Sequence, residues 1–429
     1  MQKSFIEVAP DSHFPVQNLP YGIFSTRDNP KKRVGVAIGE YVLDLPVAIE
    51  NGMFAHDAMD ARKAFNQPTL NTFISMGWGV WRSARQEIEG LLDFDTVVTY
   101  FRDDSELRAK AFYLQKDVTL HMPVDIGDYT DFYSSKEHAT NVGIMFRGKE
   151  NALMPNYLHL PVGYHGRASS VVVSGTNIHR PQGQMLPQGA TTPIFGPSKL
   201  LDFELEMGHF IGEGNPLGEP IYDNDARYLH HKNVFGMVLV NDWSARDIQA
   251  WEYQPLGPFL AKNFATSISP WVVPTDALYP FRTMPPMQDP APLPYLQLKE
   301  DFTYDIQLEV GLKTAQMDTP HIISRSNFKH LYWTIAQQVN HHTITGCNLR
   351  TGDLLASGTI SGPTPDSYGS LLELTWRGAN PITLPSGETR KFLEDGDTLT
   401  MTGYCQGDGY RVGFGTVTGT ILPALDLGF

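Results

Sequence analysis

Short apolar runs, rich in β-branched residues and bounded by glycine and proline, recur along the chain from residue 124 onward. Such runs at roughly ten-residue spacing predict strands joined by turns. The predicted strands span residues 169–174, 202–210, 234–241, 304–310, 353–359, 371–376 and 398–404. This spacing favours an antiparallel or mixed β-sandwich or roll, so the predicted fold class is mostly β.

The first 120 residues have a different pattern. Two short strands are predicted at 33–39 and 41–45, around a Gly-Glu turn, and helical spacing of apolar residues follows at 57–65 and 81–92. The segment His121-Met122-Pro123 is a plausible junction, because proline disfavours helix in the residue before it.

Two helices are predicted within the β-rich region. Ser326 is a suitable N-cap, and apolar residues follow it at helical spacing as far as Val339. A second, short helix is predicted at 243–253. The proline-rich segment 280–294 is expected to be an ordered surface loop.

Composition and charge exclude several classes of protein. Of the 429 residues, 41% are hydrophobic and 19% are charged, which is typical of a globular protein. The formal charge of −14 argues against general binding to nucleic acid or to an anionic membrane, since both need a basic surface. The two cysteines make no disulfide framework. No apolar run has the length of a membrane span, and the first ten residues contain no apolar core of signal-peptide length, so we expect a cytoplasmic protein.

Acidic residues alternate with apolar ones in the predicted strand 201–210. Asp202, Glu204 and Glu206 point to one face, which the alternation predicts to be the polar face of a half-buried strand. A bound cation would relieve the repulsion among them, although a solvated strand face would give the same pattern. Asp131 and Asp242 are further candidates, and oxygen ligands suit Mg²⁺ or Ca²⁺.

Basic and amide side chains near these carboxylates could serve catalysis. Arg246, Gln249 and Tyr253 share one face of the short predicted helix, where the first two could hold an oxyanion or could belong to an ordinary polar face. Lys262 follows an apolar run, so it could offset the carboxylates or extend its stem along the surface. His138 is a candidate base, although a lone histidine is more often structural. Ser134 and Ser135 precede it, but closeness in sequence does not make a serine-hydrolase triad.

Together these segments resemble the fumarylacetoacetate hydrolase family. The resemblance runs through nearly the whole chain and includes the opening stretch 14–22. Its motifs are Gly127-Asp-Tyr-Thr-Asp-Phe-Tyr133, Pro161-Val-Gly-Tyr-His-Gly-Arg-Ala-Ser169, Leu201-Asp-Phe-Glu-Leu-Glu206, Asn241-Asp-Trp-Ser-Ala-Arg-Asp-Ile-Gln249, Gly257-Pro-Phe-Leu-Ala-Lys262 and Ala356-Ser-Gly-Thr-Ile-Ser-Gly362. The wider superfamily includes decarboxylases, isomerases and hydratases. The N-terminal region and the 128–132 segment narrow the resemblance to members that hydrolyse fumarylacetoacetate.

The resemblance implies a fold, an assembly and an activity. Residues 1–121 would form a small N-terminal SH3-like β-barrel domain, and residues 122–429 a C-terminal catalytic domain with a mixed β-sandwich roll. The protein would be a homodimer. It would hydrolyse a carbon–carbon bond of its small-molecule substrate, 4-fumarylacetoacetate, to give fumarate and acetoacetate, the last step of tyrosine and phenylalanine degradation.

The resemblance also implies a role for each motif residue. His138 would be the base that activates water, oriented by Glu373, and the oxyanion would be held by Arg246, Gln249 and Lys262. The implied ligands of an active-site Ca²⁺ or Mg²⁺ are Asp131, Glu204, Glu206 and Asp242. The implied substrate contacts are Tyr133, Arg147, Tyr164, Gln249, Tyr253 and Thr359. Backbone oxygens of Lys262 and Thr266 match a second, structural site for Mg²⁺ or a monovalent cation, since an ammonium group cannot itself ligate a metal.

Two other functions stay open at this stage. A lyase or isomerase, such as a decarboxylase of a related dicarbonyl acid, could use the same scaffold, but it would need no water-activating base such as His138. A non-catalytic module stabilised by calcium is the other alternative. The tyrosines, arginine and lysine grouped with the acidic residues argue against that module.

Overall fold

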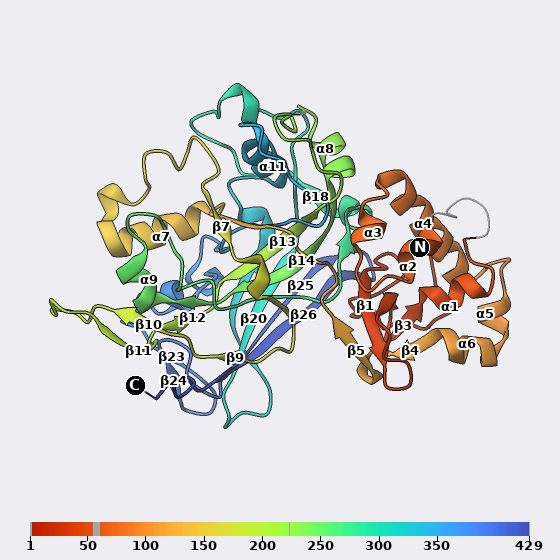
Figure 1. Ribbon diagram of the computed structural model, residues 1–429, viewed down its shortest axis with the longest axis horizontal. Helices are drawn as coiled ribbons and strands as arrows, with labels where there is room; N and C mark the ends of the chain where they lie inside the picture. The colour runs from red at the N-terminus through yellow and green to blue at the C-terminus, as the bar shows by residue number, and fades with distance from the viewer. Residues whose placement is uncertain (1, 55–60, 223, 429) are drawn as a thin grey trace.

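The computed structural model describes residues 2–54, 61–222 and 224–428. Figure 1 shows the N-terminal region on one side of the molecule and a larger, β-rich region on the other. The described helices include none with both the length and the apolar character needed to cross a bilayer.

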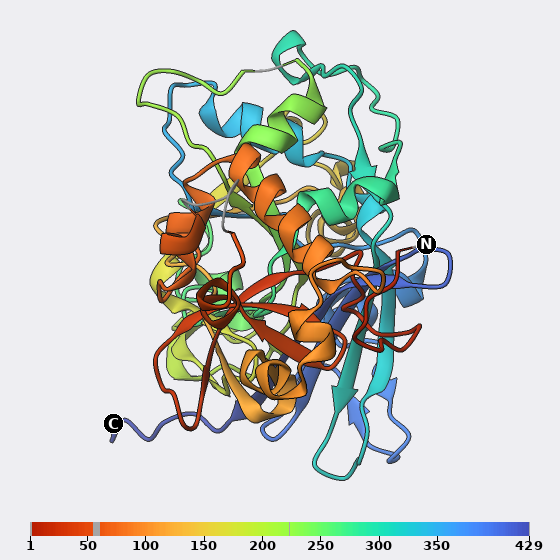
Figure 2. The same ribbon diagram turned by 90° about the vertical axis from the view of Figure 1, so that its right-hand side faces the viewer.

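The N-terminal region is built on an antiparallel sheet of five strands in the order β4-β3-β2-β1-β5. The strands are β1 (Tyr21–Thr26), β2 (Arg33–Ile38), β3 (Tyr41–Asp44), β4 (Phe112–Leu114) and β5 (Val118–His121). The predicted hairpin is therefore confirmed as β2 and β3. In Figure 2 this sheet and its helices lie in front of the larger region.

Six α-helices accompany this sheet within the described residues. They are α1 (Leu45–Glu50), α2 (Ala61–Phe65), α3 (Asn71–Ile74), α4 (Trp78–Leu92), α5 (Tyr100–Asp103) and α6 (Ser105–Ala111). The longest, α4, confirms the helix predicted at 81–92. Of the helix predicted at 57–65, residues 57–60 lie outside the described residues, and the remainder is α2.

Two mixed sheets form the larger region. The eight-stranded sheet has the order β7-β6-β22-β13-β14-β16-β8, with β17 also paired to β14. Its strands are β6 (Tyr129–Phe132), β7 (Gly163–Gly166), β8 (Val171–Val173), β13 (Leu205–Ile211), β14 (Val234–Asp242), β16 (Thr266–Ile268), β17 (Val273–Pro274) and β22 (Leu354–Ala356). The five-stranded sheet, in the order β21-β20-β25-β26-β9, consists of β9 (Ile178–His179), β20 (Gln307–Lys313), β21 (His321–Asn327), β25 (Thr398–Gln406) and β26 (Arg411–Leu422).

Apolar residues cover both faces of the eight-stranded sheet. Met207 and Leu239 share one core with Leu308 and Phe414 of the five-stranded sheet, so the two sheets are layers around common apolar contacts. On the other face, Val238, Val240 and residues of β22 join the core of the N-terminal region. Strands buried on both faces explain why 234–241 is almost continuously apolar instead of alternating.

The prediction of a half-buried acidic strand at 202–210 was wrong on two points. The segment is interrupted between β12 (Leu201–Asp202) and β13. Its carboxylates are also buried, with Asp202, Glu204 and Glu206 exposed by 0%, 5% and 0%. Local alternation reports which side chains share a face, but coverage by distant parts of the chain decides whether that face meets water.

The prediction of a strand at 371–376 was also wrong. Residues Leu371–Leu374 form the short helix α12. Ser370 caps it by accepting a hydrogen bond from the N–H of Glu373, and Trp376 leaves the helix with a φ of 49°. Capping therefore outweighed the apolar character of this run.

The helix expected to have Ser326 as its N-cap is instead capped eight residues later, by Thr334. Ser326 belongs to β21, and the helix is α11 (Ile335–Thr343). Thr334 and Gln337 form a capping box at its start. The helix predicted at 243–253 is α9 (Arg246–Glu252), preceded by the two-residue strand β15 (Ser244–Ala245), which pairs with β12.

Candidate active site

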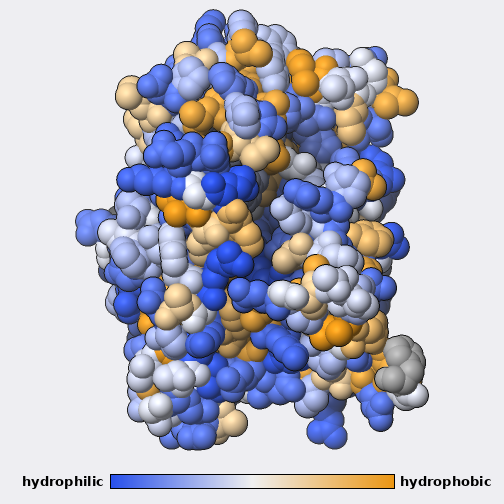
Figure 3. All heavy atoms as spheres, turned by 90° about the vertical axis from the view of Figure 1, so that its left-hand side faces the viewer, coloured by the Kyte–Doolittle hydropathy of each residue, from blue (hydrophilic) through white to orange (hydrophobic). Residues whose placement is uncertain are grey.

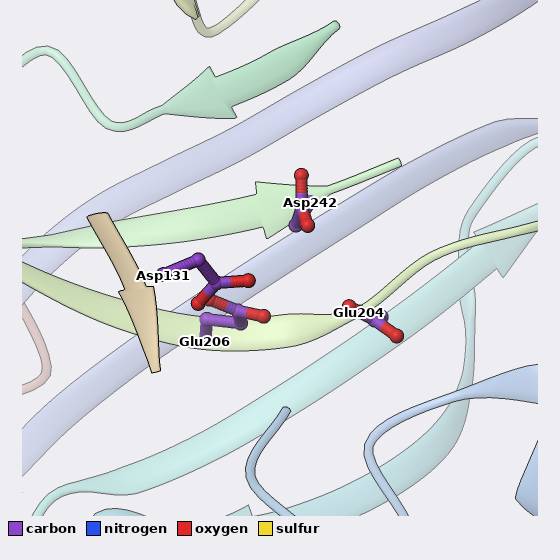
Figure 4. Close-up of side chains that lie close together, drawn as sticks. All are labelled: Asp131, Glu204, Glu206 and Asp242. Atoms are coloured by element: carbon purple, nitrogen blue, oxygen red, sulfur yellow. The ribbon is translucent and has the colours of Figure 1, made fainter. Parts of the chain in front are cut away.

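Four carboxylates from three strand segments meet on one face of the eight-stranded sheet. Asp131 lies on β6, Glu206 on β13 and Asp242 at the end of β14, while Glu204 directly precedes β13. One oxygen from each carboxylate lies within 4.8 Å of the corresponding oxygen of every other, and all four residues are buried (Figure 4). We call these four residues the acidic cluster.

Strand register explains why this cluster forms. Glu206 pairs with Val240, and the N–H of Asp242 donates to the carbonyl of Glu204, so residues two apart on each strand share one face. The N–H of Gly358 donates to Asp131 at 3.1 Å. Gly358 has a φ of 75°, and a Cβ there would lie 2.2 Å from a backbone oxygen, so this contact requires glycine.

Two cations neutralise one side of the acidic cluster. The ammonium of Lys262 donates to Glu204 and, at 2.7 Å, to Asp242. Arg246 contacts the other oxygen of Glu204 at 2.8 Å. Burial acts to raise the pKa of Glu204, but Lys262 and Arg246 outweigh it and lower that pKa to about 2. Glu204 is therefore ionised at neutral pH.

The other side of the cluster lacks this compensation. Both carboxylate oxygens of Glu206 are buried without a hydrogen-bond partner among the described residues. Burial, followed by the charges of neighbouring carboxylates, raises the pKa of Glu206 and of Asp131 well above the usual range. A hard divalent cation would supply the missing positive charge and use these oxygens as ligands. The cluster therefore could hold a metal ion.

A histidine–carboxylate pair lies in the same region. His138 is on α7 (Lys136–Arg147), where its backbone N–H donates to the N-cap Ser135. The Nδ1 atom of His138 lies 2.6 Å from Oε2 of Glu373, and both side chains are buried. The contact leaves Nε2 as the ring nitrogen that can exchange a proton with a substrate or water. The two residues are 235 positions apart, so sequence spacing could not place them together.

Three further side chains hold Glu373. The Ser361 hydroxyl lies 2.9 Å from both carboxylate oxygens, the Ser370 hydroxyl donates at 2.8 Å, and the Asn141 amide donates at 2.9 Å. Burial acts to raise the pKa of Glu373, but His138 and the hydrogen bonds from Asn141 and Ser370 hold it below the usual value. Sequence analysis missed all three. Only Asn141, three residues after His138 on one helix, left a usable signal.

Arg246 and Gln249 lie side by side on α9, which confirms that they share a face. Nη1 of Arg246 donates to Oε1 of Gln249 at 3.1 Å, so the amide nitrogen of Gln249 remains available as a donor. Nη2 of Arg246 is buried and has no hydrogen-bond partner among the described residues. Such N–H donors are suited to hold an oxygen that gains negative charge.

Four residues predicted to contact the substrate or a second cation lie next to the acidic cluster or the histidine pair. The hydroxyl groups of Tyr164 and Thr266 donate to the two oxygens of Asp242 at 3.0 and 2.8 Å. The rings of Tyr133 and His138 meet edge to face, 5.2 Å apart. Thr359 is buried and directly follows Gly358. These four residues thus lie around the acidic cluster or the histidine pair.

Arg147 and Tyr253 lie farther out. Arg147 ends α7, is exposed, and donates to backbone oxygens of Asn151 and Ala152. Tyr253 follows α9 and is 47% exposed. Both side chains are exposed, and their roles as substrate contacts remain predictions.

A cavity of about 180 Å³ adjoins the cluster. Its walls include Tyr164, Asp242, Lys262 and Thr266. Figure 3 shows the face of the molecule that carries α7 and α9, where hydrophilic residues surround a central hollow. The site therefore combines buried charges with an adjoining cavity lined in part by polar side chains.

Comparison with protein families decides the classification. Residues 129–422 match the family described as fumarylacetoacetate hydrolase C-terminal, and residues 17–123 match the one described as fumarylacetoacetase N-terminal. The chain belongs to the fumarylacetoacetate hydrolase family. The resemblance seen in the sequence motifs is thereby confirmed.

Relatives in this family are similar over almost their whole length. The fumarylacetoacetase of Homo sapiens is 60% identical over 423 residues, covering 98% of this chain and 99% of the relative. That of Arabidopsis thaliana is 56% identical over 422 residues, with the same coverage. A solved fumarylacetoacetate hydrolase from psychrophilic Exiguobacterium antarcticum aligns with 94% of this chain and 99% of its own, with a TM-score of 0.50 and 16% identity. That likeness supports the fold alone.

Proposed function

We propose that this protein hydrolyses 4-fumarylacetoacetate to fumarate and acetoacetate. The observation that carries the proposal is the pairing of His138 with Glu373 beside a buried four-carboxylate cluster. A base next to a candidate metal site fits hydrolysis of a dicarbonyl compound. The 60% identity to a fumarylacetoacetase supports the choice of substrate.

Each residue has a role in the proposed reaction. His138 takes a proton from water at Nε2, and Glu373 fixes the ring through Nδ1 and stabilises its charged form. The water oxygen attacks the ketone carbon, whose oxygen becomes negative and is held by Arg246, Gln249 and Lys262. The bond between this carbon and the acetoacetate carbon then breaks. The leaving carbon keeps the electron pair as an enolate and takes up the proton that His138 removed from water, which returns His138 to its neutral form.

Ca²⁺ or Mg²⁺ is the proposed cofactor, held by Asp131, Glu204, Glu206 and Asp242. When bound, such an ion stabilises enolate charge on a 1,3-dicarbonyl group as a Lewis acid. The orphaned oxygens of Glu206 support a ligand role for this residue. We also propose a second, structural Mg²⁺ or monovalent cation at the backbone oxygens of Lys262 and Thr266.

Substrate contacts are proposed for the side chains around the site. Tyr133, Tyr164 and Thr359 would contact the dicarbonyl part. The exposed Arg147 would hold a carboxylate of the substrate through two parallel hydrogen bonds, with Tyr253 beside the bound substrate.

We also propose finer structural and cellular features of this protein. They are an SH3-like barrel within residues 1–121, a β-sandwich roll within residues 122–429, a homodimer, a cytoplasmic location, and a place at the end of tyrosine and phenylalanine degradation. The five-stranded N-terminal sheet and the two layered sheets support the first two.

The direct test is incubation of the metal-loaded protein with fumarylacetoacetate, followed by absorbance. We expect the substrate absorbance to fall and one fumarate and one acetoacetate to form per substrate consumed. Release of carbon dioxide would indicate a decarboxylase, and a rearranged product of unchanged mass would indicate an isomerase. An unchanged substrate would contradict the proposal and favour a binding module.

A further inference from the structure

Asp202 is a buried carboxylate between Arg246 and the His138–Glu373 pair. The proposed reaction assigns it no role. It is 0% exposed. Its Oδ1 accepts from the N–H groups of Phe203 at 2.8 Å and Leu371 at 2.7 Å. Its Oδ2 accepts from Nε of Arg246 at 2.8 Å and the N–H of Leu372 at 3.0 Å.

On one side, Asp202 fixes the direction of Arg246. A guanidinium is a planar fork, so an anchor at Nε determines where both terminal nitrogens point. One of these, Nη1, contacts Glu204 and Gln249, whereas Nη2 has no partner among the described residues. Asp202 therefore directs the donor that the proposed reaction needs for the oxyanion.

On the other side, Asp202 holds the start of α12. The first N–H groups of a helix have no partner within the helix, and α12 has only four residues. The N–H groups of its first two residues donate to Asp202, and its third residue is Glu373, the partner of His138. Contacts from one carboxylate thus reach both Arg246 and the histidine pair.

We propose that Asp202 is a positioning residue that holds Arg246 and the His138–Glu373 pair in a fixed arrangement. The inference rests on the proposed hydrolysis, because the arrangement matters only where base and oxyanion donors act on one substrate. Asp202 is distinct from the acidic cluster, since each of its oxygens already accepts two hydrogen bonds. Asp202 acts through Arg246 and Glu373 and does not touch the substrate.

The test is a pair of double-mutant cycles at saturating metal, with kcat and KM measured on fumarylacetoacetate. Asp202→Asn is combined with Arg246→Met in one cycle and with His138→Ala in the other. We expect Asp202→Asn alone to lower kcat by about 10–100-fold, the range for loss of an outer partner of a site, with KM changed much less. Both double variants should lose less than the product of the single losses, because the groups act as a unit.

Asp44→Asn is the matched control. Asp44 is 1% exposed, pairs with Arg33 at 2.7 Å and accepts a backbone N–H, but it lies in the N-terminal sheet. Its loss should lower stability and leave kcat unchanged. Should Asp202→Asn fail to fold, Asp202→Glu keeps the charge but lengthens the side chain. This variant should retain metal affinity while kcat falls.

Three results would overturn the inference. They are a kcat for the Asp202 variant equal to that of the Asp44 control, losses that multiply independently in both cycles, or a fall in calorimetric metal affinity that matches Glu206→Gln. A wild-type protein that leaves fumarylacetoacetate intact would instead overturn the proposed function, and the inference with it. If the wild type hydrolyses fumarylacetoacetate and Asp202→Asn is equally active, the inference about Asp202 is overturned and the proposed function stands.

Discussion

Glu206 and Glu373 are both carboxylates buried to at least 99%, yet their surroundings act on them in opposite directions. Glu206 has two oxygens without hydrogen-bond partners among the described residues and three carboxylates for neighbours, and its pKa is raised. Glu373 accepts from two serines and an asparagine and contacts a histidine, and its pKa is lowered.

The difference between these two buried carboxylates comes from their partners. Burial acts in the same direction on both residues. The protein completes the environment of Glu373 with its own side chains, which suits a fixed orienting role. It leaves Glu206 incomplete, which suits a ligand that receives its positive partner from solution.

The largest effect should come from removing the histidine that Glu373 orients. His138→Ala should lower kcat by about 10²–10⁴-fold, since that is the usual contribution of a general base. Metal affinity measured by calorimetry should stay unchanged, because the acidic cluster is intact. The exposed His179 provides a control, and His179→Ala should leave kcat as it is. Near-normal turnover of His138→Ala would remove this residue from its role.

Arg246 is linked to both the acidic cluster and the proposed oxyanion site. It neutralises Glu204, and its Nη2 atom has no hydrogen-bond partner among the described residues. Arg246→Met at saturating metal should lower kcat by about 10²–10³-fold, the range for one oxyanion donor, and raise KM far less. A tetrahedral phosphorus analogue of the attacked carbon should lose affinity in parallel. If analogue affinity stays constant while KM rises, Arg246 binds the ground-state substrate instead.

Glu206→Gln should weaken Ca²⁺ or Mg²⁺ binding at least about tenfold and raise KM as well. Removing a residue that only supports a metal ligand already costs about tenfold, so loss of a ligand should cost at least as much. In the absence of metal, the same substitution should instead raise the free energy of unfolding relative to wild type. The folded-state pKa of Glu206 lies above its ordinary value of 4.5. The contribution of this carboxyl group to the free energy of unfolding is therefore fully present below pH 4.5 and is lost as pH rises through the folded-state pKa.

Urea unfolding of the metal-free proteins at several pH values checks this sign. The stability advantage of Glu206→Gln over wild type should grow as pH rises above about 4.5. Glu388→Gln is a control at a half-buried carboxylate whose pKa is lowered by hydrogen bonds, so its effect should not follow this trend. An advantage that is independent of pH, or unchanged metal affinity, would contradict the ligand assignment.

The smallest effect is expected at Ser361, which donates to Glu373 and accepts from the N–H of Gly369. Ser361→Ala should lower kcat about tenfold, as expected for an outer partner of a catalytic group. Since the folded-state pKa of Glu373 is lowered, its contribution to stability is present above its ordinary pKa and lost as pH falls through the folded one. In the variant, this acid loss should begin at a higher pH. An unaltered acid-unfolding curve would mean that the other partners of Glu373 keep its pKa low without Ser361.

Local pattern predicted more of the fold than of the site. The hairpin β2–β3, helix α4 and strands β13, β14 and β25 were predictable, because each carries its periodicity within its own residues. Helix α12 was not, because two of its N–H groups donate to Asp202, which lies 169 and 170 residues away. The late start of α11 followed from capping by Thr334, which outweighed the equally suitable Ser326.

The sequence by itself determined the mostly β composition, the acidic pair Glu204 and Glu206 on one strand face, and the shared face of Arg246 and Gln249. These features depend only on residues close together in the chain. Tertiary structure alone decided that Asp131 and Asp242 complete the cluster, that Glu373 meets His138, and that all these charges are buried. The reason is physical: the cost of a buried charge depends on which distant groups surround it, and no local spacing encodes that.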